Sequence, residues 1–267
     1  MYFKDQVVWI TGASSGIGEA LALDLSQRDA ILILSARNRE KLEAVRQRCA
    51  RPDRVEVLPL DLSDIGGVER VAGEGLALHG RVDFLINNGG VSQRALVEDT
   101  SMAVYRQLID TNLLGPIALT KALVPSMRAR KWGHIITVSS LTGKFSTPLR
   151  SGYAASKHAL HGFFDALRME VWRDGIRVTV VCPGYVRTNV SLNALTGDGT
   201  PQGTMDKGQE KGMSPAKCAD LILWAAERGK NEVYIGGFER FYVYFSRLFP
   251  DTFKQMIRTV NFTPEEP

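Results

Sequence analysis

Two residues of this sequence, Tyr153 and Lys157, stand four positions apart in a stretch predicted to be helical, so their side chains lie on one face, one turn apart. A free phenol has a pKa of ~10 and exchanges protons poorly near neutral pH. A nearby ammonium group favours the phenolate and lowers that pKa. Such a pair can pass a proton to or from a carbonyl or alcohol oxygen. Ser140 follows an apolar, β-branched run over 135–138 and could hold the same oxygen.

A glycine-rich turn near the N-terminus indicates the kind of cofactor with which the Tyr153 and Lys157 pair would act. An apolar run over 7–10 leads through Thr11 to Gly18 into a helical pattern. Glycines let a backbone approach a pyrophosphate, which then binds the unpaired N–H groups at the start of the helix. The spacing is G-x-x-x-G-x-G, and a lone glycine-rich stretch can be only a turn. Its position after the first strand favours a dinucleotide cofactor.

Taken together, these motifs resemble those of the short-chain dehydrogenases/reductases, and the resemblance covers nearly the whole chain. The matching positions, in order, are Gly12, Gly16, Gly18, Asn87-Asn88-Gly89-Gly90 (with glycine for the usual alanine), Asn112, Ser140, Tyr153, Lys157 and Pro183-Gly184. Residues 87–94, the residues around Tyr153 and the sequence 232–237 are similar, more narrowly, to the "member 7" group of dehydrogenase/reductase proteins.

The resemblance implies catalytic roles for four residues. Tyr153 is expected to act as general acid in reduction and general base in oxidation. Lys157 is expected to lower the pKa of Tyr153 and to bind the nicotinamide ribose. Ser140 is expected to bond the substrate oxygen, and Asn112 to hold a water molecule that links Lys157 to solvent.

The end of the second predicted strand favours NADP(H) over NAD(H). An NAD enzyme needs an acidic residue there, whereas this chain has Ala36 followed by Arg37, which could pair with a 2′-phosphate, with Ser15 and Ser35 adding hydrogen bonds. Asp61 is expected to accept from the adenine amino group or to cap the next helix. The predicted cofactor-binding residues are Gly12, Ser14, Ser15, Gly16, Ile17, Gly18, Arg37, Asn38, Asp61, Leu62, Asn88, Gly89, Gly90, Tyr153, Lys157, Pro183, Gly184, Val186 and Thr188.

The predicted function is NADP(H)-dependent interconversion of a carbonyl and an alcohol on an apolar, medium-sized substrate, with reduction as the expected direction. Candidate pocket residues, besides Ser140, are Leu141, Phe145, Leu149, Tyr185 and Leu192. Two alternatives remain: an NADPH-binding sensor or scaffold protein without turnover, and a nucleotide-sugar epimerase or dehydratase. The intact set of four catalytic residues speaks against the first, and the short C-terminal sequence against the second.

The composition of the chain limits the number of domains, the kinds of partner and the location that we expect. The 267 residues, 44% hydrophobic and 23% charged, fit one domain over 1–267. The net charge of +4 is dispersed, which speaks against a nucleic-acid partner. We expect no metal site. The three cysteines lack the spacing of metal ligands, and no further ligand stands at metal spacing from His158 and His161. The first strand begins near residue 6 and no run reaches a membrane span, so we expect a cytoplasmic protein.

Apolar runs alternate with helical patterns, which predicts an α/β, doubly wound (Rossmann) parallel sheet with helices on both faces. The expected strands are 6–10, 30–35, 54–59, 82–86, 133–138, 176–181 and 232–235, and the expected helices 16–27, 38–49, 64–79, 101–130, 152–173 and 214–228. The resemblance implies the strand order 3-2-1-4-5-6-7. Every motif follows a strand, so we expect them to meet at the carboxyl edge of the sheet.

Two segments depart from this alternation. Residues 187–213 are polar and irregular, typical of a lid over the substrate, or else of a surface insertion. The C-terminal extension, 238–267, carries apolar and basic residues interleaved over 238–262, which could cover the substrate cleft, a partner subunit or an anionic membrane surface. The resemblance also implies a homodimer or homotetramer, with the helices at 101–130 and 152–173 paired across a two-fold axis.

Overall fold

Seven parallel strands form one sheet in the computed structural model, which describes residues 2–259. The order along the sheet is β3-β2-β1-β4-β5-β6-β7, so the predicted fold and strand order are confirmed. The bounds are β1 (Val7–Thr11), β2 (Ile31–Ser35), β3 (Val55–Val57), β4 (Phe84–Asn87), β5 (Gly133–Val138), β6 (Ile176–Pro183) and β7 (Glu232–Ile235).

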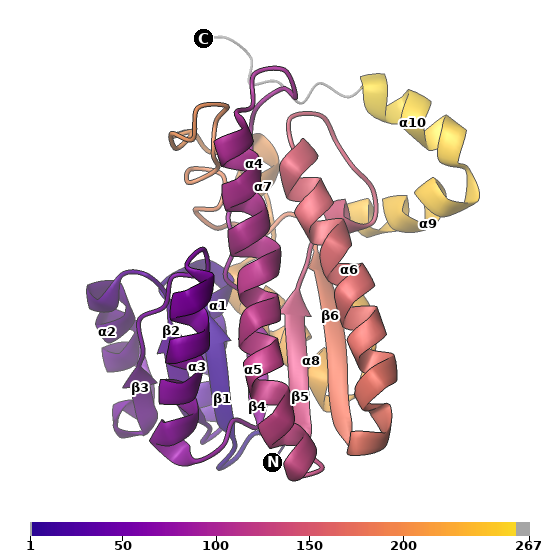
Figure 1. Cartoon of the computed structure of the whole chain (residues 1–267). Helices are drawn as coiled ribbons and strands as arrows, with labels where there is room; N and C mark the ends of the chain where they lie inside the picture. The colour runs from indigo at the N-terminus through magenta and orange to yellow at the C-terminus, as the bar shows by residue number, and fades with distance from the viewer. Residues whose placement is uncertain (1, 260–267) are drawn as a thin grey trace.

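Helices cover both faces of the sheet (Figure 1). One face carries α1 (Gly16–Gln27), α2 (Arg39–Arg48) and α8 (Pro215–Glu227), and the other carries α3 (Ile65–His79), α5 (Gly115–Ala129) and α6 (Ser151–Val171). All five residues of β1 and all four of β4 are buried, because strands covered on both faces must be apolar throughout. This explains why the strands read as continuous apolar runs.

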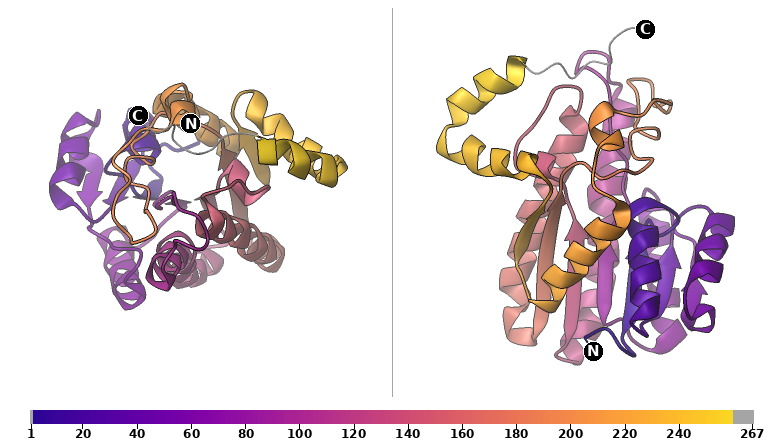
Figure 2. Two further views of the ribbon diagram at one scale, coloured as in Figure 1. Left: turned by 90° about the horizontal axis from the view of Figure 1, so that it is seen from above. Right: turned by 180° about the vertical axis from the view of Figure 1, so that it is seen from behind.

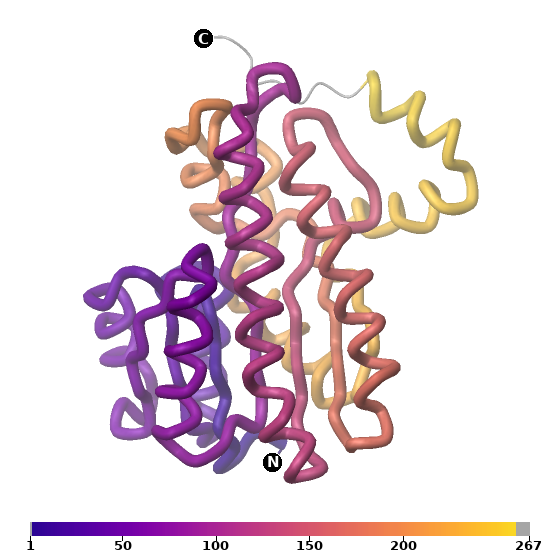
Figure 3. Tube along the Cα trace, viewed as in Figure 1, coloured from indigo at the N-terminus to yellow at the C-terminus, as the bar shows by residue number. Residues whose placement is uncertain are grey.

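The helix predicted at 101–130 is one continuous path with an irregular turn inside it (Figure 3). α4 (Met102–Ile109) passes through a π-helical turn, Asp110–Leu114, into α5. At Gly115 a Cβ would lie 2.3 Å from the carbonyl oxygen of Leu62, so only glycine lets this helix approach the loop after β3. The irregular turn lies directly before Gly115 and contains Asn112.

Capping side chains fix where the helices begin. Asn38 Oδ1 accepts a hydrogen bond from Lys41 N (2.8 Å), Asp64 Oδ1 from Gly67 N (3.0 Å) and Ser214 Oγ from Lys217 N (3.2 Å). Since Asp64 caps α3, the alternative role of Asp61 as that cap is wrong.

Two segments lie above the carboxyl edge of the sheet (Figure 2). One connects β6 to α8 and contains the short helix α7 (Lys207–Glu210); bridges between Gln93 and Leu195 and between Val186 and Met213 tie it down. The other contains α9 (Phe241–Leu248) and α10 (Pro250–Thr259), which project to the side as an arm (Figure 1). Val260 and the rest of the predicted extension lie outside the described residues.

The remaining short elements are 3-10 turns at Pro52–Arg54, Leu141–Gly143, Trp172–Asp174 and Phe238–Arg240. Within residues 2–259, no helix combines the length and the apolar character that crossing a membrane requires.

Candidate active site

A cavity of about 1010 Å³ opens at the carboxyl edge of the sheet, beside β1 and β4 where the strand order reverses. Ligands in open parallel sheets bind at this point. The volume lies at the upper end of the range for small-molecule sites, so the cavity has room for a cofactor and a second compound.

The glycine-rich turn packs so tightly against the loop after β4 that side chains are excluded. Gly12 has φ +65°, and a Cβ there would lie 2.7 Å from Gly89 Cα. At Gly18 a Cβ would lie 2.2 Å from Gly12 O. Asn88 Nδ2 donates to Thr11 O (3.0 Å) and locks the two loops together. The unpaired N–H groups at the start of α1 therefore stand beside open space, as a pyrophosphate requires.

Most of the predicted cofactor residues line the cavity. They are Gly12, Ser14, Ser15, Gly16, Ile17, Arg37, Asn38, Asp61, Leu62, Asn88, Gly89, Gly90, Tyr153, Lys157, Pro183, Gly184, Val186 and Thr188. Gly18 is absent from the wall, because its place in the structure is the contact with Gly12 beneath the turn.

The end of the cavity next to β2 is basic. Arg37 and Lys41 line it, and Ser35 and Ala36 precede them without an acidic residue. Ser35 lines the cavity as well; its hydroxyl accepts from Trp9 Nε1 (2.8 Å) and gives its one proton to Leu58 O (2.5 Å). Lys41 was not predicted; its position in the first turn of α2, three residues after the Asn38 cap, is the signal that could have identified it.

Tyr153, Ser140 and Lys157 meet on the wall of the same cavity. Ser140 Oγ accepts from Thr142 N (3.1 Å), which fixes the serine at the start of a 3-10 turn. Lys157 Nζ donates to Val138 O (2.9 Å) and lies 5.8 Å from the centroid of the Tyr153 ring.

Two arginines add positive charge beside Tyr153, besides the predicted Lys157. Burial raises the pKa of Tyr153, while a hydrogen bond with Ser140 and the charges of Arg150 and Arg94 lower it, leaving a net increase. Burial also lowers the pKa of Lys157 to about 8. The Tyr153 ring thus has the Lys157 ammonium over it and two guanidinium groups nearby.

Asn112 lies behind the cavity wall, fully buried. Its Oδ1 accepts from Val91 N (2.8 Å), and its Nδ2 donates to Val91 O (2.9 Å) and Ser156 Oγ (3.0 Å). The side chain predicted to hold a water molecule therefore joins the loop after β4 to the helix that carries Tyr153 and Lys157.

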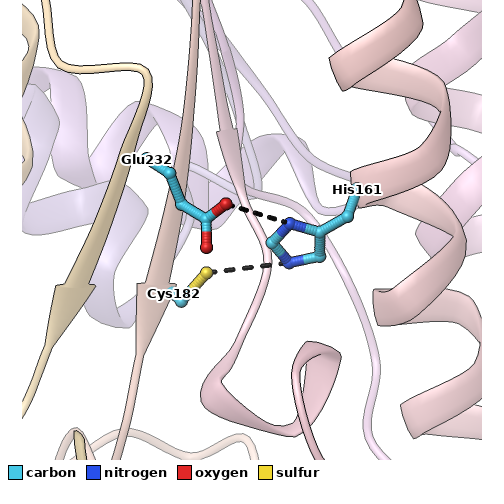
Figure 4. Close-up of side chains that lie close together, drawn as sticks. All are labelled: His161, Cys182 and Glu232. Atoms are coloured by element: carbon cyan, nitrogen blue, oxygen red, sulfur yellow. Dashed lines mark hydrogen bonds and ion pairs between the residues drawn. The ribbon is translucent and has the colours of Figure 1, made fainter. Parts of the chain in front are cut away.

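His161, predicted to be a packing or surface histidine, is buried between two other polar side chains (Figure 4). Its Nε2 lies 3.7 Å from Cys182 Sγ and its Nδ1 lies 3.9 Å from a Glu232 carboxylate oxygen. The expectation that no further ligand stands near His161 is thus wrong. However, the two contacts use opposite nitrogens of one ring, and Lys144 Nζ bonds Glu232 (2.9 Å), so the arrangement favours a hydrogen-bonded cluster over a chelate.

On the substrate side, Leu141, Phe145 and Tyr185 line the cavity as predicted, and Leu149 and Leu192 do not. Leu149 has φ +66°, and its carbonyl accepts from Ala95 N (3.1 Å), a turn that takes the side chain elsewhere. The carbonyl oxygen of Leu192 accepts from Gly203 N (3.0 Å), a contact within the segment between β6 and α8. Arg94, Arg150 and Glu239 also line the cavity and were not among the predicted pocket residues. Four residues of the segment 238–262, which the sequence suggested could cover the substrate cleft, line it too: Phe238, Tyr242, Met256 and Ile257.

The C-terminal arm covers part of this side. Phe253 is buried, with its ring centroid 5.2 Å from that of Phe145 and 6.1 Å from that of Tyr242. By contrast, Phe238 and Leu248 are each 72% exposed. The arm thus covers the cleft with one side and leaves apolar side chains on the other.

Comparison with known proteins agrees with this geometry. The family model described as short chain dehydrogenase matches residues 6–197. Dehydrogenase/reductase SDR family member 7B of Xenopus tropicalis is 44% identical over 243 residues, covering 88% of this chain and 79% of the relative. Dehydrogenase/reductase SDR family member 7 of Homo sapiens is 46% identical over 237 residues, covering 86% and 70%.

Solved structures share the fold. A short-chain dehydrogenase from Streptomyces avermitilis superimposes with a TM-score of 0.81 at 32% identity, covering 97% of this chain and all of the other. A metagenomic short-chain oxidoreductase in complex with NADP superimposes with a TM-score of 0.73 at 32% identity, covering 88% and 98%.

Proposed function

The chain belongs to the short-chain dehydrogenase/reductase family, in the group of members 7 and 7B, and we propose that it uses NADP(H) to interconvert a carbonyl and an alcohol on an apolar, medium-sized substrate. The observation that carries this proposal is the meeting of Tyr153, Ser140 and Lys157 on the wall of the cavity that the glycine-rich turn also lines. When bound, the nicotinamide supplies or accepts the hydride.

The side chains supply the proton and hold the substrate oxygen. In reduction, the Tyr153 hydroxyl gives its proton to the oxygen of the carbonyl, and in oxidation the phenolate removes it. Ser140 bonds the same oxygen. Lys157, whose pKa burial lowers to about 8, can exchange a proton close to neutral pH. Asn112 holds the helix of Tyr153 against the loop after β4.

Replacing Tyr153 with phenylalanine tests the catalytic assignment. The variant should bind NADPH almost as the wild type does and lose turnover by about hundredfold or more, the contribution of a positioned acid. Turnover is followed by NADPH absorbance on a panel of ketones and aldehydes. A variant that keeps more than a few per cent of the wild-type rate contradicts the assignment. Tight NADPH binding by a wild type without activity across the panel would favour the sensor or scaffold alternative.

The preference for NADP(H) is supported by Arg37 and Lys41 at the end of β2, where no acidic residue stands. Arg37→Ala should weaken NADPH binding by about tenfold or more and leave NADH binding nearly unchanged, because only NADPH carries the 2′-phosphate. Lys217→Ala, on the exposed surface of α8, is the matched control. Wild-type binding of NADH as tight as that of NADPH overturns the preference.

We also propose that the protein forms a homodimer or homotetramer through α4, α5 and α6. Met102, Leu114, Met169 and Trp172 on or next to these helices are exposed apolar side chains that a second copy could cover. Light scattering at micromolar concentration should give a multiple of the 29.5 kDa chain mass, and a particle of that single mass would contradict the proposal.

A cytoplasmic location with peripheral membrane contact completes the proposal. The exposed side of the arm combines Phe241, Leu248 and Phe249 with nearby Arg240 and Arg247, which suits an anionic lipid surface. The thiols of Cys49, Cys182 and Cys218 are free and buried, as in a reducing compartment. The full-length protein should co-sediment with anionic liposomes at low salt, whereas protein remaining in the supernatant excludes membrane contact. Cell fractionation tests the location.

A further inference from the structure

Two arginines and one carboxylate meet beside Tyr153 on the substrate side of the cavity. Arg94 follows β4, Arg150 precedes α6, and Asp206 belongs to the segment between β6 and α8. Arg94 Nε donates to Asp206 Oδ2 (3.0 Å), Arg94 Nη2 bonds the same oxygen, and Arg150 Nη2 reaches it at 3.2 Å. Gln202 Nε2 donates to Oδ1 at 3.2 Å.

This cluster carries more positive than negative charge. One carboxylate faces two guanidinium groups whose side chains are only 9% (Arg94) and 11% (Arg150) exposed. Arg94 is otherwise satisfied, since its Nη1 donates to Ser92 Oγ (2.8 Å) and Gln93 O. Arg150 donates only to Asp206, and its buried Nε has no partner among the described residues. Burial and the charge of Arg150 lower the pKa of Arg94, and the hydrogen bond and charge of Asp206 only partly offset this decrease.

The other charges on the cavity wall, among the residues that the structure describes, do not balance this excess. Arg37, Lys41 and Asp61 lie at the end next to β2, where the proposed cofactor accounts for the positive charge. Among residues 2–259, Glu239 is the remaining carboxylate that lines the substrate side; it accepts from Tyr185 N (3.4 Å) and packs against Gly184 and Gly236. Within the described part of the chain, the excess positive charge therefore remains next to Tyr153, on the wall of the space that a substrate would occupy.

We propose that the substrate carries a carboxylate close to its reacting carbonyl, and that Arg150, with Arg94, binds it while Tyr153 and Ser140 hold the carbonyl oxygen. This rests on the proposed function and narrows it to a keto acid, or the matching hydroxy acid, with an apolar remainder. The apolar part lies against Phe145, Tyr242 and Met256 on the same cavity wall. A guanidinium group offers paired donors that match a carboxylate, and burial strengthens the pairing.

The test compares keto acids with their neutral methyl esters. Phenylpyruvate and benzoylpropionate, which place the carboxylate at two distances from the carbonyl, are each assayed with NADPH beside their esters. The wild type should prefer at least one acid by about tenfold or more in kcat/KM, as a charge-assisted hydrogen bond provides. Arg150→Gln should remove most of that preference by raising KM for the acid, and Arg150→Lys should restore part of it.

Asp206→Asn separates anion binding from a purely structural role. If the arginines bind the substrate carboxylate, removing the competing carboxylate should increase the preference for the acid, opposite to the effect of Arg150→Gln. If they only anchor the segment between β6 and α8, both variants should lower activity on acid and ester alike, which overturns the inference. Arg37→Gln is the matched control and should change the KM for NADPH without changing the ratio of acid to ester. Thermal unfolding of each variant verifies that it folds.

A binding measurement keeps the inference independent of turnover. Calorimetry with the NADP⁺-loaded wild type should detect benzoylpropionate binding that Arg150→Gln weakens by about tenfold. Absence of binding in the wild type overturns the inference, as does a wild type that reduces the ester as well as the acid. Equal reduction of ester and acid would leave the proposed carbonyl reduction intact. Binding of the acid without NADPH oxidation would instead contradict the proposed function and support the anion site.

Discussion

The two ends of the cavity are built by different means. At the cofactor end, backbone forms much of the wall and its support: Gly12, Gly18 and Gly89 pack so closely that a Cβ on any of them would collide with a neighbour. At the substrate end the wall is made of side chains from the loop after β4, the start of α6, the segment after β6 and the C-terminal arm. A wall of backbone admits few sequences, whereas a wall of side chains can change one residue at a time.

Gly18→Ala should produce the largest effect and damage only the cofactor end. The new Cβ would lie 2.2 Å from Gly12 O, and the turn would have to move away from the loop after β4. We expect NADPH affinity to fall by about hundredfold or more, a loss of ~3 kcal/mol. Gly73→Ala on α3 is the control, because a Cβ at that position would meet no atom within 4 Å. Unchanged NADPH binding in fluorescence titrations would show that the turn is not built as described.

Phe253→Ala should affect only the substrate end. Its buried ring joins α10 to Phe145 and Tyr242, and its removal should weaken docking of α10 by about 3 kcal/mol. Hydrogen exchange in α10 should become faster and the KM for an apolar substrate should rise, while NADPH affinity stays the same. Leu248→Ala, at an exposed position of the arm, is the matched control. A loss of NADPH affinity in Phe253→Ala would mean that the two ends are coupled.

A change of one pH unit should give the smallest effect, and it should act on the sheet rather than on either end of the cavity. His134 lies buried on β5, with Nε2 2.8 Å from Thr179 Oγ1, and burial lowers its pKa from 6.5 to about 3. Below pH 6.5 the unfolded chain therefore binds a proton that the folded chain excludes. The free energy of unfolding should fall by about 1.4 kcal/mol per pH unit from this histidine as the pH drops towards its folded pKa.

Burial lowers the pKa of His161 to about 4. This histidine should therefore add to the pH dependence of the free energy of unfolding between its unfolded and folded pKa values. Urea unfolding of the wild type and His134→Gln at several pH values measures the difference. Equal slopes in the two proteins would contradict a neutral, buried His134.

The sequence predicted the fold and the cofactor end well because both depend on local patterns. Strands buried on two faces must be apolar runs, and the turn at Gly12 needs a residue that tolerates φ +65°. The meeting point of the motifs followed from the topology, since parallel strands bring their carboxyl ends to one edge. Each of these constraints can be recognised within a single segment of the sequence.

The substrate end was harder to predict because its neighbours are distant in sequence. Arg94 and Asp206 are 112 positions apart, and nothing local to either residue indicates the other. Leu149 and Leu192 were predicted as pocket residues from their apolar character alone, and neither lines the cavity. Likewise, His161 gained its neighbours Cys182 and Glu232 only when α6, β6 and β7 came together.

The burial of Trp9 gives the protein an internal optical reporter. Its ring is fully buried in β1, where Gly75 of α3 leaves it room, whereas Trp172 and Trp224 are exposed on the surface. Trp9 should therefore emit at shorter wavelength than these two and resist quenching by iodide. Because its Nε1 bonds Ser35, two residues before Arg37, its emission should respond to occupation of the adenosine end without any attached dye.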